Sequence, residues 1–303
     1  MENTKKHGFS YAKYGYLFSI PFIVVFLIFH LYPTINTAIL GFTDCKGLGN
    51  TTWHFLKEDI FRNFKIVLAS DTFRLALKNT VVLWIVNFIP QMCLALLLTA
   101  WFTSRRNQIE GQGFFKVVLY MPNIITAATV AILYNALFAY PNGPVNDLLV
   151  SWGILDKSFN FQVSQTAARL TVSFIQFWMW YGYTMIILVS GVLGINPEIF
   201  EAADIDGANN WQMFWQITIP NLKTIMIYTL ITSMIGGLSM YDIPKMYLAG
   251  GPNRATTTVS VYIYDQAFAG SYMYNRAAAA SMILFLIIAV FSGIVFYMMR
   301  DKD

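Results

Sequence analysis

One segment of the sequence places neutral polar and aromatic residues on a single helical face. Ser173, Gln176, Trp180, Tyr183 and Thr184 recur at spacings of three and four residues, which puts them on one side of an α-helix. Amides and hydroxyls can hydrogen-bond to hydroxyl groups, and flat rings can cover the apolar face of a sugar. This face therefore suits an uncharged polyhydroxylated solute. The alternative is that the aromatics mark a membrane interface and the polar residues bridge packed helices.

Ionisable residues are scarce within the apolar parts of the chain. Asp242 and Lys245, on either side of Pro244, are the only candidates at the end of an apolar run. A proton- or sodium-coupled carrier is expected to place an acidic residue near the middle of a membrane span. The scarcity argues against such a carrier. Gln176, Trp180, Tyr183 and Asp242 are the candidate residues for a solute pathway.

The connection 191–223 predicts a short acidic helix. Asn196 is a good N-cap, Pro197 suits a first helical turn, and Gly207 suits a helix end. Between them lie three acidic residues at three-residue spacing and two alanines that leave a low-relief surface: Glu198, Glu201, Asp204, Ala202 and Ala203. Such a helix could dock into a basic groove of a partner protein. The alternative is an ordinary amphipathic linker helix, which these residues by themselves slightly favour.

No catalytic constellation is visible in the sequence. No Ser/His/Asp or Cys/His grouping can be argued, no CxxC pair occurs, and His7, His30 and His54 are isolated. The dipeptide Gly-Lys is absent, so the chain contains no Walker A phosphate-binding loop. A membrane-embedded enzyme is therefore disfavoured. If ATP drives transport, the ATPase is another polypeptide.

The composition excludes a soluble enzyme. Of the 303 residues, 56% are hydrophobic and 12% are charged, whereas soluble domains carry about 25% charged residues. The net charge of +4 is scattered, without the basic block that nucleic-acid binding requires. Six runs of 18 or more residues lack Lys, Arg, Asp and Glu: 14–43, 79–104, 117–146, 170–197, 224–241 and 277–299. A helix needs about 20 apolar residues to cross a bilayer.

These runs predict an all-α integral membrane protein with six transmembrane helices. We place the spans at about 14–34, 80–101, 117–138, 169–190, 224–248 and 278–299. They form one transmembrane domain, 1–303, in the lipid bilayer. An even number of spans puts both termini on one side. Lys and Arg counts on the two sides are too similar to decide which, but the lysines before the first span favour a cytoplasmic N-terminus: Lys5, Lys6 and Lys13.

The connection 191–223 also contains a pattern found in one protein family. It resembles the EAA loop of bacterial ABC-importer permeases, EAA-x3-G-x9-I-x-LP, and reads Glu201-Ala202-Ala203-x3-Gly207-x9-Ile217-x-Ile219-Pro220. The single departure is Ile219 where leucine is common, which is a conservative difference. Eight specified positions at fixed offsets, between two predicted spans, make this resemblance specific.

The resemblance extends over most of the chain, with a family core at about 72–299. Segments similar to MalF-like sugar permeases lie at 16–21, 31–33, 79–80, 248–253, 264–268 and 276–280. The C-terminus, 298–303, lacks the long tail that is common in the MalG-like partner. The connection 139–168 is too short for the large second external domain of some MalF proteins.

The resemblance implies a type I ABC importer permease fold in the bacterial cell membrane, with both termini and the EAA loop in the cytoplasm. It implies a binding-protein-dependent importer of di- or oligosaccharides with a second MalG-like permease subunit, an ATPase dimer and an extracellular sugar-binding protein. ATP and Mg would be bound by the ATPase partner, and this chain would hold no cofactor. Glu201 would be the charged contact to the ATPase, with Ala202 and Ala203 as the close-packing surface and Gly207 as the turn. An ABC permease for another solute, such as glycerol phosphate, is the nearest alternative, although a phosphate would require Arg or Lys facing the path.

Overall fold

The chain is helical throughout the part that the structure describes. A computed structural model describes residues 12–49, 52–104 and 110–299. In these ranges every regular element is a helix, and the only strand-like pairing is an isolated bridge between Thr43 and Phe55. The prediction of an all-α protein is thus confirmed. Lys5, Lys6 and the C-terminal residues 300–303, which entered the predictions of orientation and subunit type, lie outside the described residues.

Among the described residues, five helical segments are long and apolar enough to cross a membrane. They are Lys13–Leu40, Asp71–Phe102, Gln165–Leu193, Lys223–Leu248 and Tyr274–Met298. The first segment comprises α1 (Ala12–Phe26), a π-helical turn (Leu27–Leu31) and α2 (Tyr32–Leu40). The second and third segments are α4 (Asp71–Phe102) and α8 (Gln165–Leu193). The fourth comprises α12 (Lys223–Leu238) and α13 (Asp242–Leu248), and the fifth belongs to α15 (Tyr274–Met299).

The third predicted span is not a straight helix. It is divided into α5 (Gln112–Ile124) and α6 (Ala127–Leu137), which are bent by 91° relative to each other. Ile125 and Thr126 have extended backbone conformations, and the Thr126 hydroxyl caps the second helix by accepting from the Thr129 N–H at 3.3 Å. If the bent pair is one span, the structure has the six spans that the sequence predicts.

The remaining helices are short and connect the long ones. They are α3 (Arg62–Ala69), α7 (Pro144–Ser151), α9 (Pro197–Ile205), α10 (Asn210–Gln212), a π-helical segment (Met213–Thr218), α11 (Ile219–Asn221) and α14 (Val259–Phe268). Hydroxyl side chains determine where three of the helices begin. Ser70, Ser164 and Thr258 cap α4, α8 and α14 by accepting a backbone N–H three residues ahead, which satisfies a donor that the helix itself leaves unpaired.

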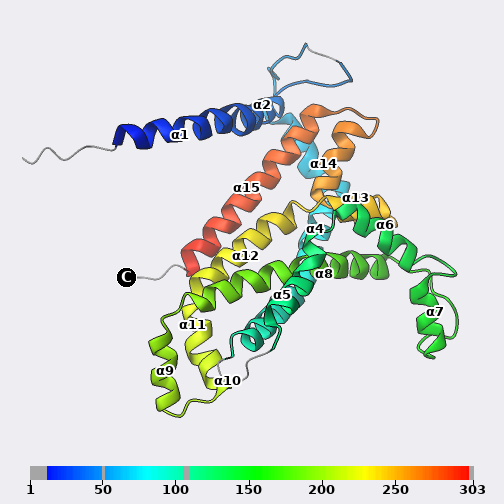
Figure 1. Ribbon diagram of the computed structural model, residues 1–303. Helices are drawn as coiled ribbons and strands as arrows, with labels where there is room; N and C mark the ends of the chain where they lie inside the picture. Colours follow the sequence, from blue (N-terminus) through cyan, green and yellow to red (C-terminus); the bar gives the residue numbers. More distant parts are fainter. Residues whose placement is uncertain (1–11, 50–51, 105–109, 300–303) are drawn as a thin grey trace, which may run out of the picture.

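α4 and α8 pack along each other and form the centre of the molecule (Figure 1). α12 and α14 pack against α4, and α15 packs against α12 and α14. One hydrophobic core lies there around Phe73, Met234 and Val259. A second core forms where α6 and α13 meet α4 and α8. α6 is the second helix of the span that begins with α5, and α13 is the second helix of the span that begins with α12. The Asn135 amide of α6 donates to the Tyr247 carbonyl oxygen of α13 at 3.0 Å.

The first helix contributes almost nothing to these cores. Residues 13–36 are exposed in the isolated chain, and α1 extends away from the body of the molecule (Figure 1). A helix that is apolar on all sides and exposed is suited to lipid or to a neighbouring subunit.

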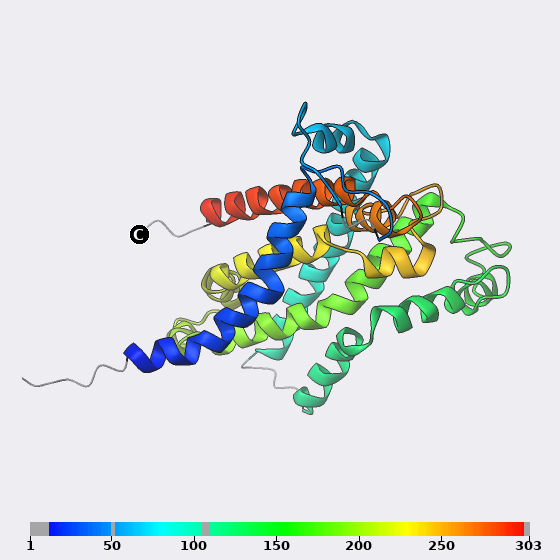
Figure 2. The ribbon, with the colours of Figure 1, turned by 90° about the horizontal axis from the view of Figure 1, so that it is seen from above.

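The two ends of the molecule differ. The N-terminal end of α1, the C-terminal end of α15 and helix α9 lie toward one end in both views, whereas α7 lies toward the opposite end (Figures 1 and 2). The termini of the described chain are therefore on the same side as the acidic helix.

Candidate functional site

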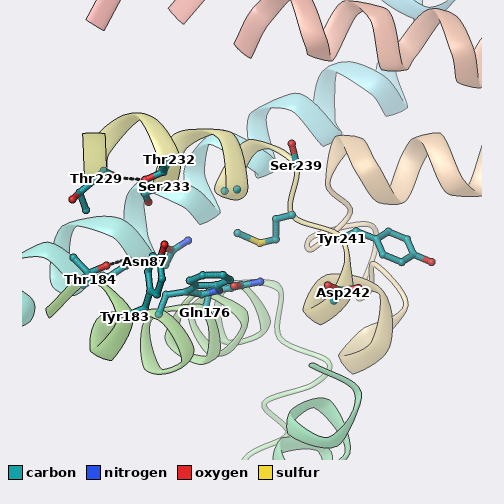
Figure 3. A pocket seen from close by; sticks show the side chains of 15 residues that line it. Asn87, Gln176, Tyr183, Thr184, Thr229, Thr232, Ser233, Ser239, Tyr241 and Asp242 are labelled. Carbon is teal, nitrogen blue, oxygen red and sulfur yellow. Dashed lines mark hydrogen bonds between the residues drawn. The ribbon is translucent and has the colours of Figure 1, made fainter. Parts of the chain in front are cut away.

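A cavity of about 290 Å³ lies between α4, α8, α12 and the break that precedes α13 (Figure 3). Its walls carry amides, hydroxyls and aromatic rings, and it is positioned where three spans converge. The lining residues are Asn87, Gln91, Gln176, Trp180, Tyr183, Thr184, Thr229, Thr232, Ser233, Gly236, Gly237, Ser239, Met240, Tyr241 and Asp242.

The structure brings all four predicted pathway residues to this cavity. Gln176, Trp180 and Tyr183 project from α8, and Asp242 is the first residue of α13. The Trp180 and Tyr183 rings are 5.7 Å apart and nearly perpendicular, at 89°. In the part of the chain that the structure describes, Gln176 makes no hydrogen bond, so its amide is available to a solute. That these residues contact a solute remains a prediction.

Ser173 has a different role from its neighbours on the same helical face. It is buried, and its hydroxyl lies 3.5 Å from the Leu83 carbonyl oxygen of α4. The residue therefore bridges two packed helices, which is the alternative that the sequence left open. Thr184, by contrast, lines the cavity and accepts a hydrogen bond from the Gln91 amide at 2.7 Å.

More than half of the polar lining comes from residues that the sequence analysis missed. Asn87 and Gln91 of α4 are four residues apart, and Thr232 and Ser233 follow Thr229 of α12 by three and four residues. This spacing was a usable signal, because polar residues at helical intervals within a charge-free run must share a face. Each face taken alone is ambiguous between a helix–helix contact and a pathway.

Internal hydrogen bonds leave the cavity with many acceptors. The Asn87 amide donates to the Leu83 carbonyl oxygen at 2.8 Å, and the Thr229 and Thr232 hydroxyls donate to Ile225 and Tyr228 carbonyl oxygens at 2.8 Å. A hydroxyl that donates to its own helix retains lone pairs for a ligand's O–H group. The arrangement can therefore accept hydrogen bonds from a polyhydroxylated molecule.

The lining carries one charged side chain. Asp242 is the only Asp, Glu, Lys or Arg among the lining residues. Lys245 lies one turn further along α13, but its ammonium donates to Asp265 at 2.6 Å instead of lining the cavity. The two ionisable candidates at the end of the fifth span thus differ in their surroundings: Asp242 lines the cavity, and Lys245 forms an ion pair with Asp265 outside it.

The acidic helix forms where the sequence predicts it. α9 runs from Pro197 to Ile205, and the Asn196 side chain caps it by accepting from the Glu198 N–H at 3.1 Å. Gly207, just past the helix end, has φ of +78°, a conformation that favours glycine. The three acidic residues are exposed: Glu198, Glu201 and Asp204.

The two alanines of α9 do not share an environment. Ala202 is exposed, whereas Ala203 is 9% exposed and faces the molecule. A nine-residue helix needs a supporting surface, and α9 packs on the following π-helical segment. Ala202 is therefore exposed on α9, whereas Ala203 packs against the chain itself. That the two alanines contact an ATPase remains a prediction.

No metal centre is formed by the residues in 12–49, 52–104 and 110–299. Within these ranges, no group of three or more His, Cys, Asp and Glu side chains could hold a metal ion.

Comparison with known proteins identifies the family. Residues 74–302 match the family described as binding-protein-dependent transport system inner membrane component. The chain belongs to this family. It is an inner-membrane component of a transport system that works with a binding protein, and its apolar helices make it a multi-pass membrane protein.

Relatives with known names match the permease over nearly its whole length. The lactose transport system permease protein LacF of Rhizobium radiobacter is 30% identical over 294 residues, with 96% of each chain covered. The multiple sugar-binding transport system permease protein MsmF of Streptococcus mutans is 28% identical, with 92% of each chain covered. The resemblance to sugar ABC importer permeases that the sequence indicates is thereby confirmed.

A solved structure shares the fold. It is the crystal structure of a bacterial ABC transporter involved in the import of the acidic polysaccharide alginate. Its matching chain has 25% sequence identity and a TM-score of 0.76, with 94% of both chains covered. The ABC importer permease fold is therefore shown for this permease as well.

Proposed function

We propose that this permease is a MalF-like subunit of an ATP-driven importer for di- or oligosaccharides, and that it forms half of the translocation pathway. The observation that carries the substrate class is the cavity lining. Amides, hydroxyls and the Trp180–Tyr183 ring pair surround about 290 Å³, and this chemistry suits the hydroxyls and the apolar face of a sugar. A phosphate-bearing solute is less favoured, because no Lys or Arg lines the cavity.

Three further components complete the proposed importer. They are a second, MalG-like permease subunit, a dimer of ATPase subunits that binds ATP and Mg, and an extracellular sugar-binding protein. The whole-length similarity to sugar permeases supports this composition. The exposed first helix supplies apolar surface for lipid or for the second permease.

We propose that α9 is the contact to the ATPase. It lies at the outer edge of one end of the molecule, and its three carboxylates are exposed there (Figure 1). An acidic helix is suited to a groove with basic residues, and Gly207 allows the chain to turn away directly after it. Closure of the ATPase dimer would then move α9 and rock the spans between inward- and outward-facing states.

This assignment sets the orientation. If α9 meets a cytoplasmic ATPase, both termini are cytoplasmic as well, because they lie toward the same end as α9 (Figures 1 and 2). The cavity then lies along the path between the external binding protein and the cytoplasm.

Charge reversal in α9 tests the coupling. We expect Glu201→Lys to leave membrane insertion intact but to reduce co-purification of the ATPase and to abolish sugar-stimulated ATP hydrolysis in the assembled importer. The reason is that a new positive charge would face basic residues of the groove. The matched control is Asp147→Lys, an exposed carboxylate on α7 at the opposite end, which should retain the ATPase.

Two results would contradict the proposal in different ways. Wild-type ATPase retention and uptake in Glu201→Lys would remove the coupling role of α9. Uptake that an ionophore abolishes and ATP depletion does not affect would indicate an ion-coupled carrier instead.

A further inference from the structure

Charge is distributed unevenly around the cavity. Asp242 is its single charged lining residue, and it lies beside Ser239 and Tyr241, where the fifth span is interrupted (Figure 3). The side chain is exposed in the chain and begins α13. It therefore lies in the cavity that the proposed function places on the solute path.

The cations of this region are bound elsewhere. Lys245 donates to Asp265 at 2.6 Å. Arg169 donates to the Ala255 carbonyl oxygen at 3.0 Å and to the Asn79 side chain at 3.1 Å. Neither lines the cavity, and no ion pair joins Asp242 to another residue of the described ranges. Among the described residues, no cation of this chain therefore neutralises the Asp242 carboxylate in the cavity.

An uncompensated carboxylate has opposite effects on neutral and on acidic sugars. It accepts strong, charge-assisted hydrogen bonds from sugar hydroxyls. It repels a second carboxylate, and the repulsion is stronger in a partly enclosed site than in bulk water. The fold itself does not impose this selectivity, because a chain of the same fold serves in the import of an acidic polysaccharide.

We propose that Asp242 is a specificity-determining residue that makes this half of the pathway favour neutral over anionic saccharides. The inference rests on the proposed function, since it assumes that the cavity lies on the solute path. It adds a named residue and a named class of excluded solute.

The electrostatic effect of the Asp242 carboxylate on charged molecules in the cavity can be measured without any sugar. Ser239, three residues before Asp242, lines the cavity and is exposed, so Ser239→Cys places a small thiol there. In the assembled importer in lipid nanodiscs, we would measure the rates at which this thiol reacts with an anionic and a cationic methanethiosulfonate of similar size. Mass spectrometry at residue 239 separates its modification from that of Cys93.

We expect Asp242→Asn to raise the ratio of the anionic to the cationic rate roughly tenfold, because loss of the carboxylate speeds one reagent and slows the other. Asp147→Asn, which removes an exposed carboxylate on α7 outside the cavity, should leave the ratio unchanged. High salt should reduce the effect of Asp242→Asn, because salt screens interactions between exposed charges.

The outcomes separate this inference from the proposed function. An unchanged ratio in Asp242→Asn would overturn the role of Asp242 and leave the sugar permease assignment standing. If Ser239→Cys resists both reagents, Thr232→Cys on α12 serves as a second reporter. Failure of both thiols to react would overturn the inference as well, because the carboxylate would then meet no solute.

Discussion

At the scale of single residues, two adjacent glycines of α12 have opposite surroundings. A Cβ atom built on Gly237 would lie 2.1 Å from Cδ1 of Trp84, whereas one built on Gly236 would meet nothing within 4 Å. The Trp84 ring cannot move freely, since it stacks on Phe88 at 5.6 Å and donates to the Ser233 hydroxyl at 3.4 Å. Gly237 is thus required by close packing, and Gly236 is not.

We predict that Gly237→Ala lowers the free energy of unfolding by roughly 1–3 kcal/mol, because an added methyl overpacks the contact with Trp84. Gly236→Ala is the matched control. It should raise stability by about 0.5–1 kcal/mol, since alanine is favoured over glycine within a helix. Thermal unfolding of the two purified variants checks this. Equal effects of the two substitutions would show that Trp84 does not restrict α12.

At the scale of elements, α5 and α8 cross at Gly182. A Cβ atom at this position would lie 2.2 Å from the Leu119 carbonyl oxygen and 2.9 Å from the Tyr120 Cα atom. These are backbone atoms, so a side chain cannot turn aside to relieve the contact. Small residues allow such close approach of spanning helices. The crossing also carries a hydrogen bond from the Asn123 amide to the Met179 carbonyl oxygen at 3.2 Å.

We predict that Gly182→Ala forces the two helices apart and costs more than about 2 kcal/mol of stability. Gly113→Ala, in α5, is the control, because its added Cβ meets nothing within 4 Å. Thermal unfolding in detergent compares the two. A Gly182→Ala protein as stable as Gly113→Ala would contradict the close crossing of α5 and α8.

Two of the spans are interrupted, one between α5 and α6 and the other between α12 and α13. The pieces beyond the breaks, α6 and α13, pack on each other, so each interruption is stabilised by the other segment. A hydropathy pattern counts apolar residues and cannot register a 91° bend. The Thr126 cap was the local signal of the first break, because a hydroxyl before an apolar stretch can start a new helix.

At the scale of the whole molecule, the orientation in the membrane is the property to test. Glu198 on α9 and Ser151 on α7 are exposed at opposite ends (Figures 1 and 2). We predict that a membrane-impermeant maleimide labels Ser151→Cys on intact cells, and labels Glu198→Cys only after the membrane is permeabilised. Labelling of Glu198→Cys on intact cells would reverse the proposed orientation.

The native cysteines interfere little with this measurement. Cys45 is buried, and burial together with the nearby Asp44 carboxylate raises the pKa of its thiol. At neutral pH less of it is therefore thiolate, the form that reacts. Cys93 is exposed on α4 within an apolar span, and a Cys93→Ala background removes its contribution.

The sequence by itself determined the membrane class, the all-helical fold and the acidic helix. Charge-free runs indicate membrane-spanning segments directly, since charge is costly in lipid. Asn196 and Pro197 indicate the start of a helix and Gly207 its end, because each suits the local backbone conformation there. These features depend on neighbours in the chain, so they can be read without a fold. The α8 face with Gln176, Trp180 and Tyr183 was readable for the same reason.

Only the tertiary structure decided what that face meets. The opposite walls of the cavity come from Asn87 and Gln91 of α4 and from Thr229 to Ser233 of α12, far away in sequence. Helical periodicity sets which residues share a face, but not which other face lies opposite, because packing of distant segments selects the partner. The same limit explains why Ser173 bridges helices, why Ala203 turns inward, and why Asp242 alone brings charge to the cavity.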